Sequence, residues 1–331
     1  MCKFIELKNT FGTEVTLCTM GASIYDIKTV DRNNNLASIL ATPKDKGEFL
    51  MATSYFGKTI GRTGGRIRNG KFVLDGIEYN IPSTDPNGLH GGVDSLSYRD
   101  FDVALSEDEK KYVVTFSYFS PHLESGYPGN AKFNVIYSLY KNENKLEVEY
   151  FATSDKKTLV NLSNHAYFNL SGNVSRDILE HELYLNSSKL LQLENMIPIS
   201  VINATPIYSF KEAHRIGDNI FKDEIMELAN GYDFPYIFDK VGYDLKNVSL
   251  YDKESGRSLA IYTTYPAVVV YTCNYPEDVV VGNDKKLKEY EAVCLECSFL
   301  PNSINNDFLE DKKDILEANK IYNEKILYVF N

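Results

Sequence analysis

Segments typical of β-strands, separated by tight-turn residues, recur along this chain and restrict what it can fold into. The clearest example surrounds Asp75-Gly76, a two-residue turn that tolerates positive φ and lies between the strand-like residues 72–74 and 77–81. Two strands joined by so short a turn must be antiparallel neighbours. The sequence therefore predicts a hairpin here, within an antiparallel sheet.

Further strand pairs are predicted downstream. Apolar and less apolar residues alternate along 133–139, and after a turn the alternation continues strictly along 146–150. Another pair runs from 248–251 into 259–262, and the β-branched run 268–271 is typical of a buried strand. Strand signals therefore extend along most of the chain.

Helical patterning is weak by comparison. It is confined to Phe210 to Ala229, which contains Gly217, and to Asp307 to Asn319. No linker, low-complexity tract or fixed-period repeat divides the chain, and sandwiches often exceed about 200 residues as one unit. We expect an all-β fold, a large antiparallel β-sandwich with a few short helices, built as a single domain over residues 1–331.

Charge limits the partners of the protein. The formal net charge is −11, which disfavours binding to nucleic acid or to an anionic membrane. A neutral small molecule fits this charge better. We expect such a ligand to be bound by a monomer or homodimer.

The cysteines and the N-terminus indicate the compartment. The five cysteines are scattered, and Cys294-x-x-Cys297 has no second pair with which to hold zinc. The N-terminus lacks the apolar core of a signal peptide, and no run of about 18 apolar residues occurs. These features predict a cytoplasmic protein with reduced thiols.

Two of the five histidines lie in contexts that suggest chemistry. His90 lies in the glycine-rich stretch 87–92, where the backbone can approach a ligand closely. His165 lies in a polar–apolar alternation beside Asn164 and Tyr167. Each also fits an ordinary role, as a loop histidine or as a hydrogen-bonded histidine within a sheet.

Two carboxylates are also unusual. Glu296 is the one charged residue of 292–299, a predicted buried strand, and a buried charge is costly unless it is protonated or hydrogen-bonded. A structural ion pair with an arginine is the alternative. Asp233 lies in the aromatic stretch 231–236, where capping a turn is its ordinary role.

Arg66 closes a stretch of small residues, 61–66, that also contains Arg62. The stretch lacks the Lys-Ser/Thr ending of a phosphate loop and does not match Gly-x-Gly-x-x-Gly, which disfavours nucleotide binding. A guanidinium beside close-packed backbone suits hydrogen bonding to vicinal hydroxyls, although a surface salt bridge is the commoner use of arginine.

Taken in order, these blocks resemble the aldose 1-epimerase (galactose mutarotase) family. The likeness covers nearly the whole chain and is carried by Gly61 to Gly70, Leu89-His90-Gly91-Gly92, Gly126 to Asn130, Asn164 to Leu170, Gly231-Tyr232-Asp233, Leu295-Glu296-Cys297 and the closing strand Lys320 to Phe330. It implies a galactose mutarotase-like supersandwich with the sugar in an open cleft, and neither metal nor organic cofactor.

The resemblance also implies residue roles. Glu296 matches the family's general base and His165 its general acid. The implied substrate-binding residues are Arg66, His90, Asp233 and Tyr167. The implied activity is that of an aldose 1-epimerase, which interconverts the α and β anomers of free aldohexoses such as galactose and glucose by ring opening and reclosure.

Several positions depart from the family's usual pattern. Cys297-Ser298 stands where the family commonly has Thr-Gln, and Asn302-Ser303 where it frequently has Asp-Ala. Phe234 stands where it frequently has histidine, and Gly65 where it usually has asparagine. These departures leave open which hydroxyl pattern is preferred.

The chemistry explains the residue types. A hemiacetal opens when its ring oxygen gains a proton and its anomeric hydroxyl loses one, so an acid and a base must reach one carbon. Histidine titrates near working pH, whereas free glutamate titrates at about 4.3. We expect desolvation beside Leu295 and Phe299 to make Glu296 a stronger base.

Three alternative functions would share a sugar cleft. A glycoside hydrolase or lyase normally needs a pair of carboxylates. A hexose-6-phosphate epimerase needs a cationic pocket for the phosphate. A non-catalytic sugar-binding protein would keep the binding residues and show no anomer exchange.

Overall fold

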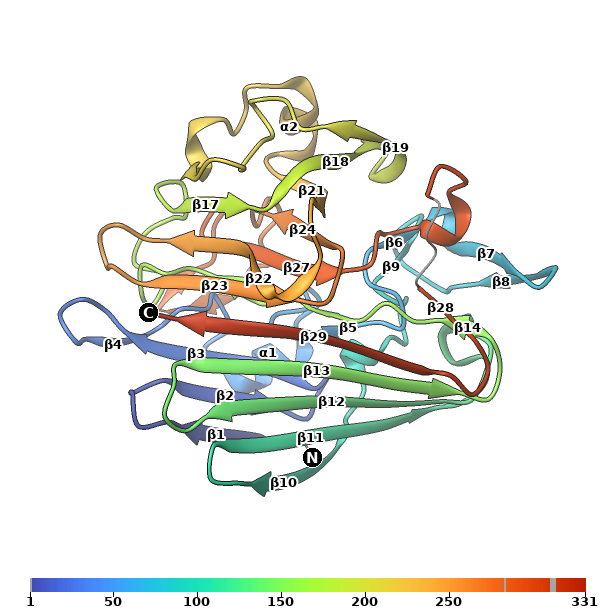
Figure 1. The fold of residues 1–331 in the computed structure, drawn as a ribbon, viewed down its shortest axis with the longest axis horizontal. Coiled ribbons are helices and arrows are strands. Elements are labelled where there is room, and N and C mark those ends of the chain that lie inside the picture. The colour runs from blue at the N-terminus through green and yellow to red at the C-terminus, as the bar shows by residue number, and fades with distance from the viewer. Residues whose placement is uncertain (1, 283, 310–313) are drawn as a thin grey trace.

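Three antiparallel sheets dominate the computed structural model, which describes residues 2–282, 284–309 and 314–331. The largest sheet crosses the view in Figure 1 from bottom to top. Its nine strands, in spatial order, are β10 (Asp102–Glu107), β11 (Lys111–Ser120), β12 (Ala131–Tyr140), β13 (Lys145–Ser154), β29 (Ile321–Phe330), β23 (Ser258–Thr263), β22 (Gly242–Tyr251), β17 (Glu182–Leu185) and β20 (His214–Arg215).

The other two sheets are smaller. One contains β1 (Phe4–Lys8), β2 (Glu14–Cys18), β3 (Ser23–Val30) and β4 (Leu36–Ser38). The other contains, in spatial order, β16 (Tyr167–Phe168), β27 (Val293–Ser298), β24 (Ala267–Tyr271), β21 (Asp233–Phe238), β18 (Ser187–Glu194) and β19 (Ile197–Asn203).

Short strand pairs form two-stranded sheets of their own. They are β5 (Thr59–Ile60) with β15 (Ser163–Asn164), β6 (Arg66–Ile67) with β9 (Gly88–Leu89), β7 (Lys71–Leu74) with β8 (Ile77–Asn80), β14 (Thr158–Leu159) with β28 (Ile315–Leu316), and β25 (Val280–Val281) with β26 (Lys285–Lys286).

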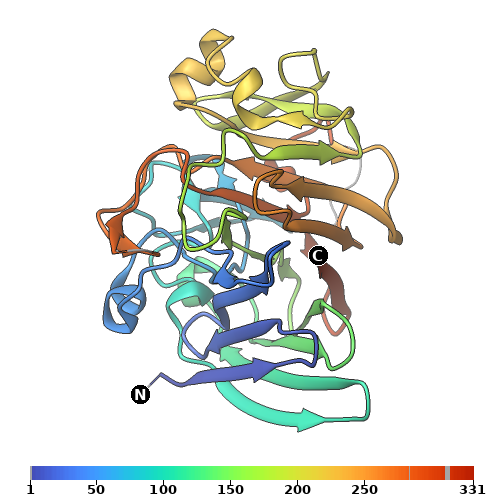
Figure 2. The same ribbon diagram turned by 90° about the vertical axis from the view of Figure 1, so that its left-hand side faces the viewer.

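A shared core holds the sheets together. Inward-facing side chains of the nine-stranded sheet, such as Val148 and Ile326, belong to the same buried cluster as Ile24 of β3 and Leu295 of β27. Both smaller sheets therefore pack against the nine-stranded one (Figures 1 and 2). The predicted antiparallel β-sandwich is confirmed.

The predicted strand pairs are also confirmed. Leu74 pairs with Ile77 across the Asp75-Gly76 turn. Tyr137 pairs with Val148 between β12 and β13, and both side chains are buried, as their alternation predicts. The third pair aligns β22 with β23 and the run 268–271 forms most of β24.

The helix predictions are mostly wrong. Within Phe210 to Ala229 the chain forms β20, then a 3-10 turn at Ile216–Asp218 containing Gly217, and only the end is helical, as α2 (Glu224–Ala229). The reason is tertiary pairing, since Leu183 of β17 takes His214 as its partner at the sheet edge.

The second predicted helix, Asp307 to Asn319, contains β28, although its residues 310–313 lie outside the described residues. The sequence did not predict α1 (Lys46–Met51), which Asp45 caps by accepting a hydrogen bond from the Glu48 amide. In the described part of the chain, α1 and α2 are both too short to cross a membrane. The other 3-10 turns are Arg68–Gly70, Leu96–Tyr98, Glu124–Gly126 and Ser303–Asn305.

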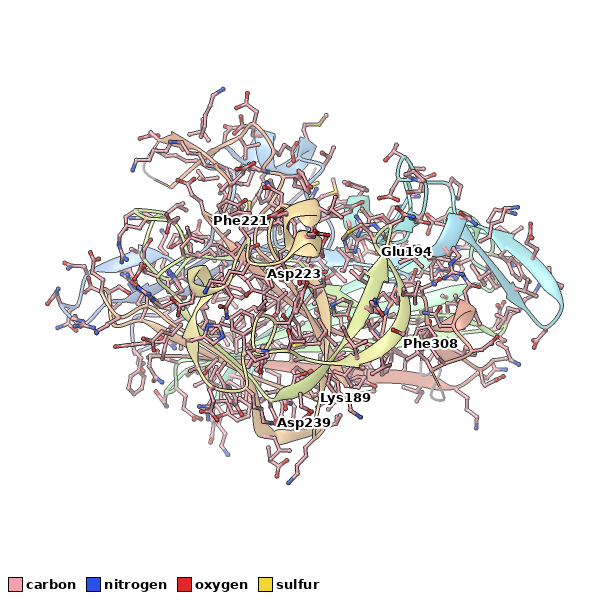
Figure 3. The ribbon with its side chains drawn as sticks, turned by 90° about the horizontal axis from the view of Figure 1, so that it is seen from above. Lys189, Glu194, Phe221, Asp223, Asp239 and Phe308 are labelled. Atoms are coloured by element: carbon pink, nitrogen blue, oxygen red, sulfur yellow. The ribbon has the colours of Figure 1, made fainter. Side chains whose placement is uncertain are left out.

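Residues 187–229 form the upper end of the molecule in Figure 1, and Figure 3 looks down on it. In that view β18, with Lys189 and Glu194, curves beside the segment of Phe221 and Asp223 that leads to α2. This end overlies β21, which carries Asp233.

The elements carrying the predicted site residues converge below that end. Glu296 lies on β27, between β16 and β24, and His165 lies in the short link between β15 and β16. Arg66 of β6 pairs with Leu89, which places His90 directly beside it in the fold.

Gly57 fixes the backbone of His165. Its amide donates to the His165 carbonyl at 2.9 Å, and its carbonyl accepts from the Asn164 side chain at 2.7 Å. Gly57 has a φ of 60°, and a Cβ at this position would lie 1.8 Å from the Ile24 carbonyl oxygen. Glycine is therefore required here by space as well as by backbone conformation.

Gly57→Ala should lower the free energy of unfolding by about 3 kcal/mol, because steric overlap adds to the cost of positive φ. Gly76→Ala is the matched control, since Gly76 has a φ of 77° but open space around its Cβ position. It should cost about 1 kcal/mol. Chemical denaturation measures both, and equal losses would contradict the steric argument.

Candidate active site

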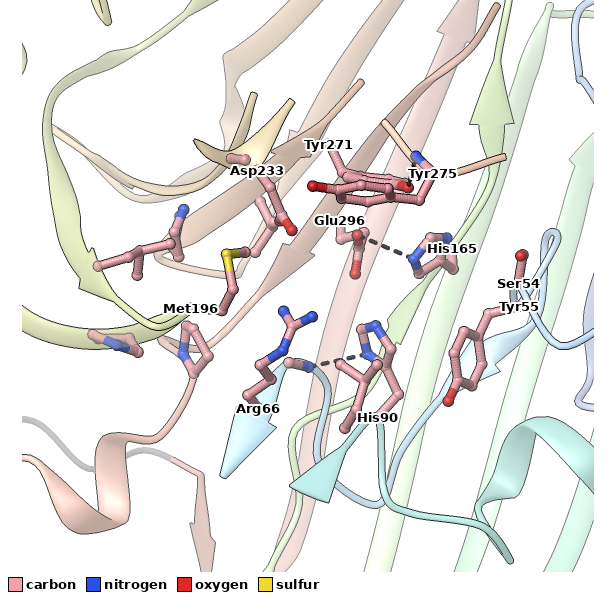
Figure 4. A pocket seen from close by; sticks show the side chains of 18 of the residues that line it. Ser54, Tyr55, Arg66, His90, His165, Met196, Asp233, Tyr271, Tyr275 and Glu296 are labelled. Carbon is pink, nitrogen blue, oxygen red and sulfur yellow. Dashed lines mark hydrogen bonds and ion pairs between the residues drawn. The ribbon is translucent and has the colours of Figure 1, made fainter. Parts of the chain in front are cut away.

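One cleft of about 360 Å³ contains every residue singled out as a site residue from the sequence. Figure 4 shows it from close by. The residues from the sequence prediction that line it are Arg66, His90, His165, Tyr167, Asp233 and Glu296. Segments far apart in the chain therefore share a cavity large enough for a small organic molecule.

His165 and Glu296 face each other at the centre of the cleft. The Nε2 atom of His165 lies 3.4 Å from Oε1 of Glu296 (Figure 4). Both residues are nearly inaccessible, at 5% and 4% exposure. The imidazole and the carboxyl thus form a buried pair that opens only toward the cleft.

Burial sets the protonation behaviour of this pair. It lowers the pKa of His165 to about 4, and it raises the pKa of Glu296 well above its ordinary value, assisted by the charge of Asp233 and opposed by that of Arg66. The attraction between an imidazolium and a carboxylate at 3.4 Å acts against burial. In the charged pair, His165 is an imidazolium and Glu296 a carboxylate. In the neutral pair, that proton has moved from His165 to Glu296, so the two forms hold the same number of protons.

The shifted pKa of Glu296 has the direction predicted from the sequence, but the surroundings differ from those predicted. Leu295 and Phe299 belong to the main core, on the opposite face of β27, because neighbouring side chains of a strand alternate. The neighbours of Glu296 in the cleft include Val269 of the adjacent β24, its direct cross-strand partner.

His90 is held as a hydrogen-bond donor. The Gly65 amide donates to its Nδ1 atom at 3.1 Å, which places the ring proton on Nε2. Burial lowers the pKa of His90 well below its ordinary value, and the positive charges of His165 and Arg66 act in the same direction. Its ring meets that of His165 edge to face at 5.3 Å.

Arg66 and Asp233 also bring charged side chains to the cleft. The Nε atom of Arg66 lies 3.3 Å from Oδ2 of Asp85, which orients the guanidinium from behind. Burial raises the pKa of Asp233 to about 6, and the charge of Arg66 opposes this shift. Asp233 can therefore be a donor or an acceptor near neutral pH.

Tyr167 lies against His165, with ring centroids 5.1 Å apart. Its hydroxyl donates to the Ser54 carbonyl at 2.9 Å, so the tyrosine also holds the neighbouring wall of the cleft. The ring of Tyr55 in that wall packs against His90 at 4.8 Å and His165 at 5.9 Å.

Sequence reasoning missed Tyr55 and several other lining residues. Tyr271 and Tyr275 stand over Glu296 and His165 in Figure 4. Leu193, Met196 and Leu228 close the cleft from the upper end of the molecule. The strand signal of 268–271 was visible, but its pairing with β27, which brings Val269 and Tyr271 to the cleft, depends on long-range contacts.

Most of the departures from the family pattern lie away from the cleft. Phe234 and Cys297 are buried in the main core, and Ser298, Asn302 and Ser303 are not among the described residues that line the cleft. Gly65 does line it. A Cβ at Gly65 would lie 2.6 Å from the Pro301 side chain, so this loop is fitted to glycine.

The donor atoms of His90, His165 and Glu296 lie within 4.8 Å of one another, a spacing that would fit a metal ion. A metal ligand must offer a lone pair, however, and the Gly65 amide leaves Nε2 of His90 protonated. We therefore interpret these residues as a proton-transfer and hydrogen-bonding set.

Similar proteins extend over nearly the whole chain. A family model described as aldose 1-epimerase matches residues 3–329. The galactose mutarotase of Sus scrofa is 31% identical, covering 96% of this chain and 91% of that protein. The aldose 1-epimerase of Escherichia coli (strain K12) is 27% identical, covering 99% of this chain and 95% of that protein.

A solved structure is similar over the same extent. The GalM/aldose epimerase homologue from C. elegans has a TM-score of 0.89 and 26% sequence identity to this chain. The match covers all of this chain and 99% of that one.

Proposed function

The chain belongs to the aldose 1-epimerase family, and we propose that it interconverts the α and β anomers of free aldohexoses such as galactose and glucose. It is an isomerase that acts on carbohydrates. The observation that carries the proposed mechanism is the contact between His165 Nε2 and Glu296 Oε1, at 3.4 Å in a closed part of the cleft. Two groups this close can reach the two oxygens of one anomeric carbon.

Ring opening starts from the charged pair. The Glu296 carboxylate takes the proton of the anomeric hydroxyl, and the bond between C1 and the ring oxygen breaks. The ring oxygen receives a proton from the His165 imidazolium. The products are the open-chain aldehyde with a free hydroxyl, a protonated Glu296 and a neutral His165.

Reclosure is the same step in reverse on the other face. The aldehyde rotates about the bond from C1 to C2, and the hydroxyl attacks the opposite face of the carbonyl. Neutral His165 takes the hydroxyl proton, and Glu296 gives its proton to the carbonyl oxygen. The pair returns to its charged form with no net oxidation, reduction or hydrolysis, so the reaction requires no co-reactant.

Two opposing effects act on the pair. Burial favours the neutral pair, which closes the ring, and the short contact favours the charged pair, which opens it. Each direction of the reaction therefore has one effect in its favour.

The other polar residues hold the sugar. Arg66, His90 and Asp233 bind its hydroxyls, with the Nε2 proton of His90 as a fixed donor, and Tyr167 contributes its ring face. Fixing the sugar reduces the entropy lost in reaching the reactive geometry. Arg66 is the one lysine or arginine among the described residues lining the cleft, and it already pairs with Asp85, which favours a neutral sugar over a phosphorylated one.

The net charge of −11 disfavours nucleic acid and anionic membranes as partners. We propose a cytoplasmic monomer or homodimer. A single domain over residues 1–331 is supported by the main core, which draws on residues from Val15 to Phe330.

His165→Ala and Glu296→Gln should each lower kcat for anomer exchange by about 10³-fold, because each removes one proton-transfer group. Polarimetry of freshly dissolved α-galactose and α-glucose measures the rate. His214→Ala is the control, since His214 lies on β20, outside the cleft, and this variant should keep the wild-type rate.

Several results would count against the proposal. If the wild-type protein binds sugar but does not accelerate anomer exchange, it is a sugar-binding protein. Release of reducing ends from an oligosaccharide would indicate a hydrolase. If His165→Ala and Glu296→Gln each keep the wild-type rate of anomer exchange, the pair of His165 and Glu296 does not transfer the protons.

The pair itself should not titrate through neutrality, although Asp233, whose pKa burial raises to about 6, titrates just below it. The pair works with one proton, and adding a second one requires protonating His165 while Glu296 is already protonated. Because burial lowers the pKa of His165 to about 4, the fall in kcat/KM that belongs to the pair should come as pH drops through about 4. At alkaline pH, kcat/KM should fall as the pH rises through the raised pKa of Glu296, because the pair then loses its one proton.

Polarimetry in a series of buffers measures this profile. The Asp233→Asn variant lacks the carboxyl whose pKa is about 6. In that variant, loss of half the remaining activity near pH 6.5, where an ordinary histidine titrates, would contradict the assignment.

A further inference from the structure

Cys294 contacts the second nitrogen of His165. Its Sγ atom lies 3.5 Å from Nδ1 of His165, on the side of the ring away from Glu296. Cys294 is two residues before Glu296 on β27, so both side chains lie on the same face of the strand. One strand therefore supplies a partner to each nitrogen of this imidazole.

The two cleft histidines differ in what their Nδ1 atoms meet. Nδ1 of His90 receives the Gly65 amide, and an amide nitrogen can only donate. Nδ1 of His165 meets a thiol sulfur, which can accept a hydrogen bond as well as donate one. The hydrogen bond made by one ring nitrogen decides what the other nitrogen can do.

The partner of Nδ1 decides whether each histidine can exchange a proton at Nε2. His90 cannot place a proton on Nδ1 without losing the Gly65 bond, so its Nε2 keeps its proton and remains a donor. His165 can keep a proton on Nδ1, shared with Cys294, while Nε2 gains and loses another. Of these two histidines, only His165 can therefore carry a proton to and from a substrate through Nε2.

We propose that Cys294 is a positioning residue, whose sulfur accepts the Nδ1 proton of His165 and so makes His165, rather than His90, the histidine that exchanges a proton with the sugar. This inference rests on the proposed function. The thiol holds the ring without adding a negative charge beside it. Burial also raises the pKa of Cys294 well above its ordinary value, which keeps the sulfur protonated and neutral.

Other titratable or charged groups lie near His165. Those that contact it, or that lie farther along the same cleft, are Glu296 on β27, His90, Tyr55, Tyr167, Tyr271, Tyr275, Arg66 and Asp233. A substitution at Cys294 leaves all of these side chains in place.

The test uses the full-length protein and nitrogen-15 NMR of the imidazole rings, assigned with His165→Ala and His90→Ala. Unliganded wild-type protein at neutral pH should show neutral His165 with its proton on Nδ1 and neutral His90 with its proton on Nε2. This measurement needs no activity, so it separates the present inference from the proposed function.

Cys294→Ala should lower kcat by about 10-fold with KM nearly unchanged, because the sugar-binding groups remain. It should also move the acid limb of kcat/KM to lower pH, since the buried imidazolium then lacks an acceptor at Nδ1. Cys294→Ser, which keeps an acceptor, should restore most of kcat.

Cys297→Ala is the matched control. Cys297 is a buried cysteine of the same strand, but it faces the main core. This variant should lose stability without changing the ring tautomers or kcat.

The inference is overturned if neutral His165 carries its proton on Nε2, or if Cys294→Ala keeps the wild-type kcat and acid limb. If Cys294→Ala does not fold, the wild-type spectra and the serine variant decide the matter.

Discussion

The buried contact between the His165 imidazole and the Glu296 carboxyl is the interaction on which the other features of the cleft depend. In water at neutral pH, the carboxyl would be charged and the imidazole would be charged in part, since its ordinary pKa is about 6.5. In the cleft, burial acts against both charges, and the 3.4 Å separation acts in their favour. A pair in which these effects oppose each other can pass a proton in either direction, which is what a reversible ring opening requires.

The sandwich makes this contact rigid. Glu296 lies on β27, which has hydrogen-bonded neighbours on both sides, and His165 is tied through its backbone to Lys58 and Gly57. The rings of Tyr55 and Tyr167 pack against the imidazole from the side. Because these supports come from separate segments of the chain, the geometry of the site is a property of the whole fold.

The sequence was informative wherever local pattern decides the structure. The Asp75-Gly76 turn, the alternation along 133–150 and the buried character of 292–299 predicted strands that the structure contains. Ordered motifs pointed to all six site residues that share the cleft. The spacing of these residues could not show that they meet in one cleft. The resemblance to a family predicted that they do.

Local pattern failed where long-range pairing decides. The edge pairing of His214 replaced an expected helix, and the pairing of β24 with β27 selected which residues surround Glu296. Tyr55 carries no motif, and Cys294 resembles any cysteine of a buried strand until its distance to His165 is known. Even the desolvation of Glu296 was predicted with the wrong neighbours, since Leu295 and Phe299 face away.

The most direct measurement is a crystal structure of the Glu296→Gln variant with galactose bound. The ring oxygen should lie within about 3.2 Å of His165 Nε2, and the anomeric hydroxyl within the same distance of the side-chain amide at position 296. A sugar bound with its anomeric carbon directed away from this pair, or bound outside the cleft, would contradict the proposed mechanism.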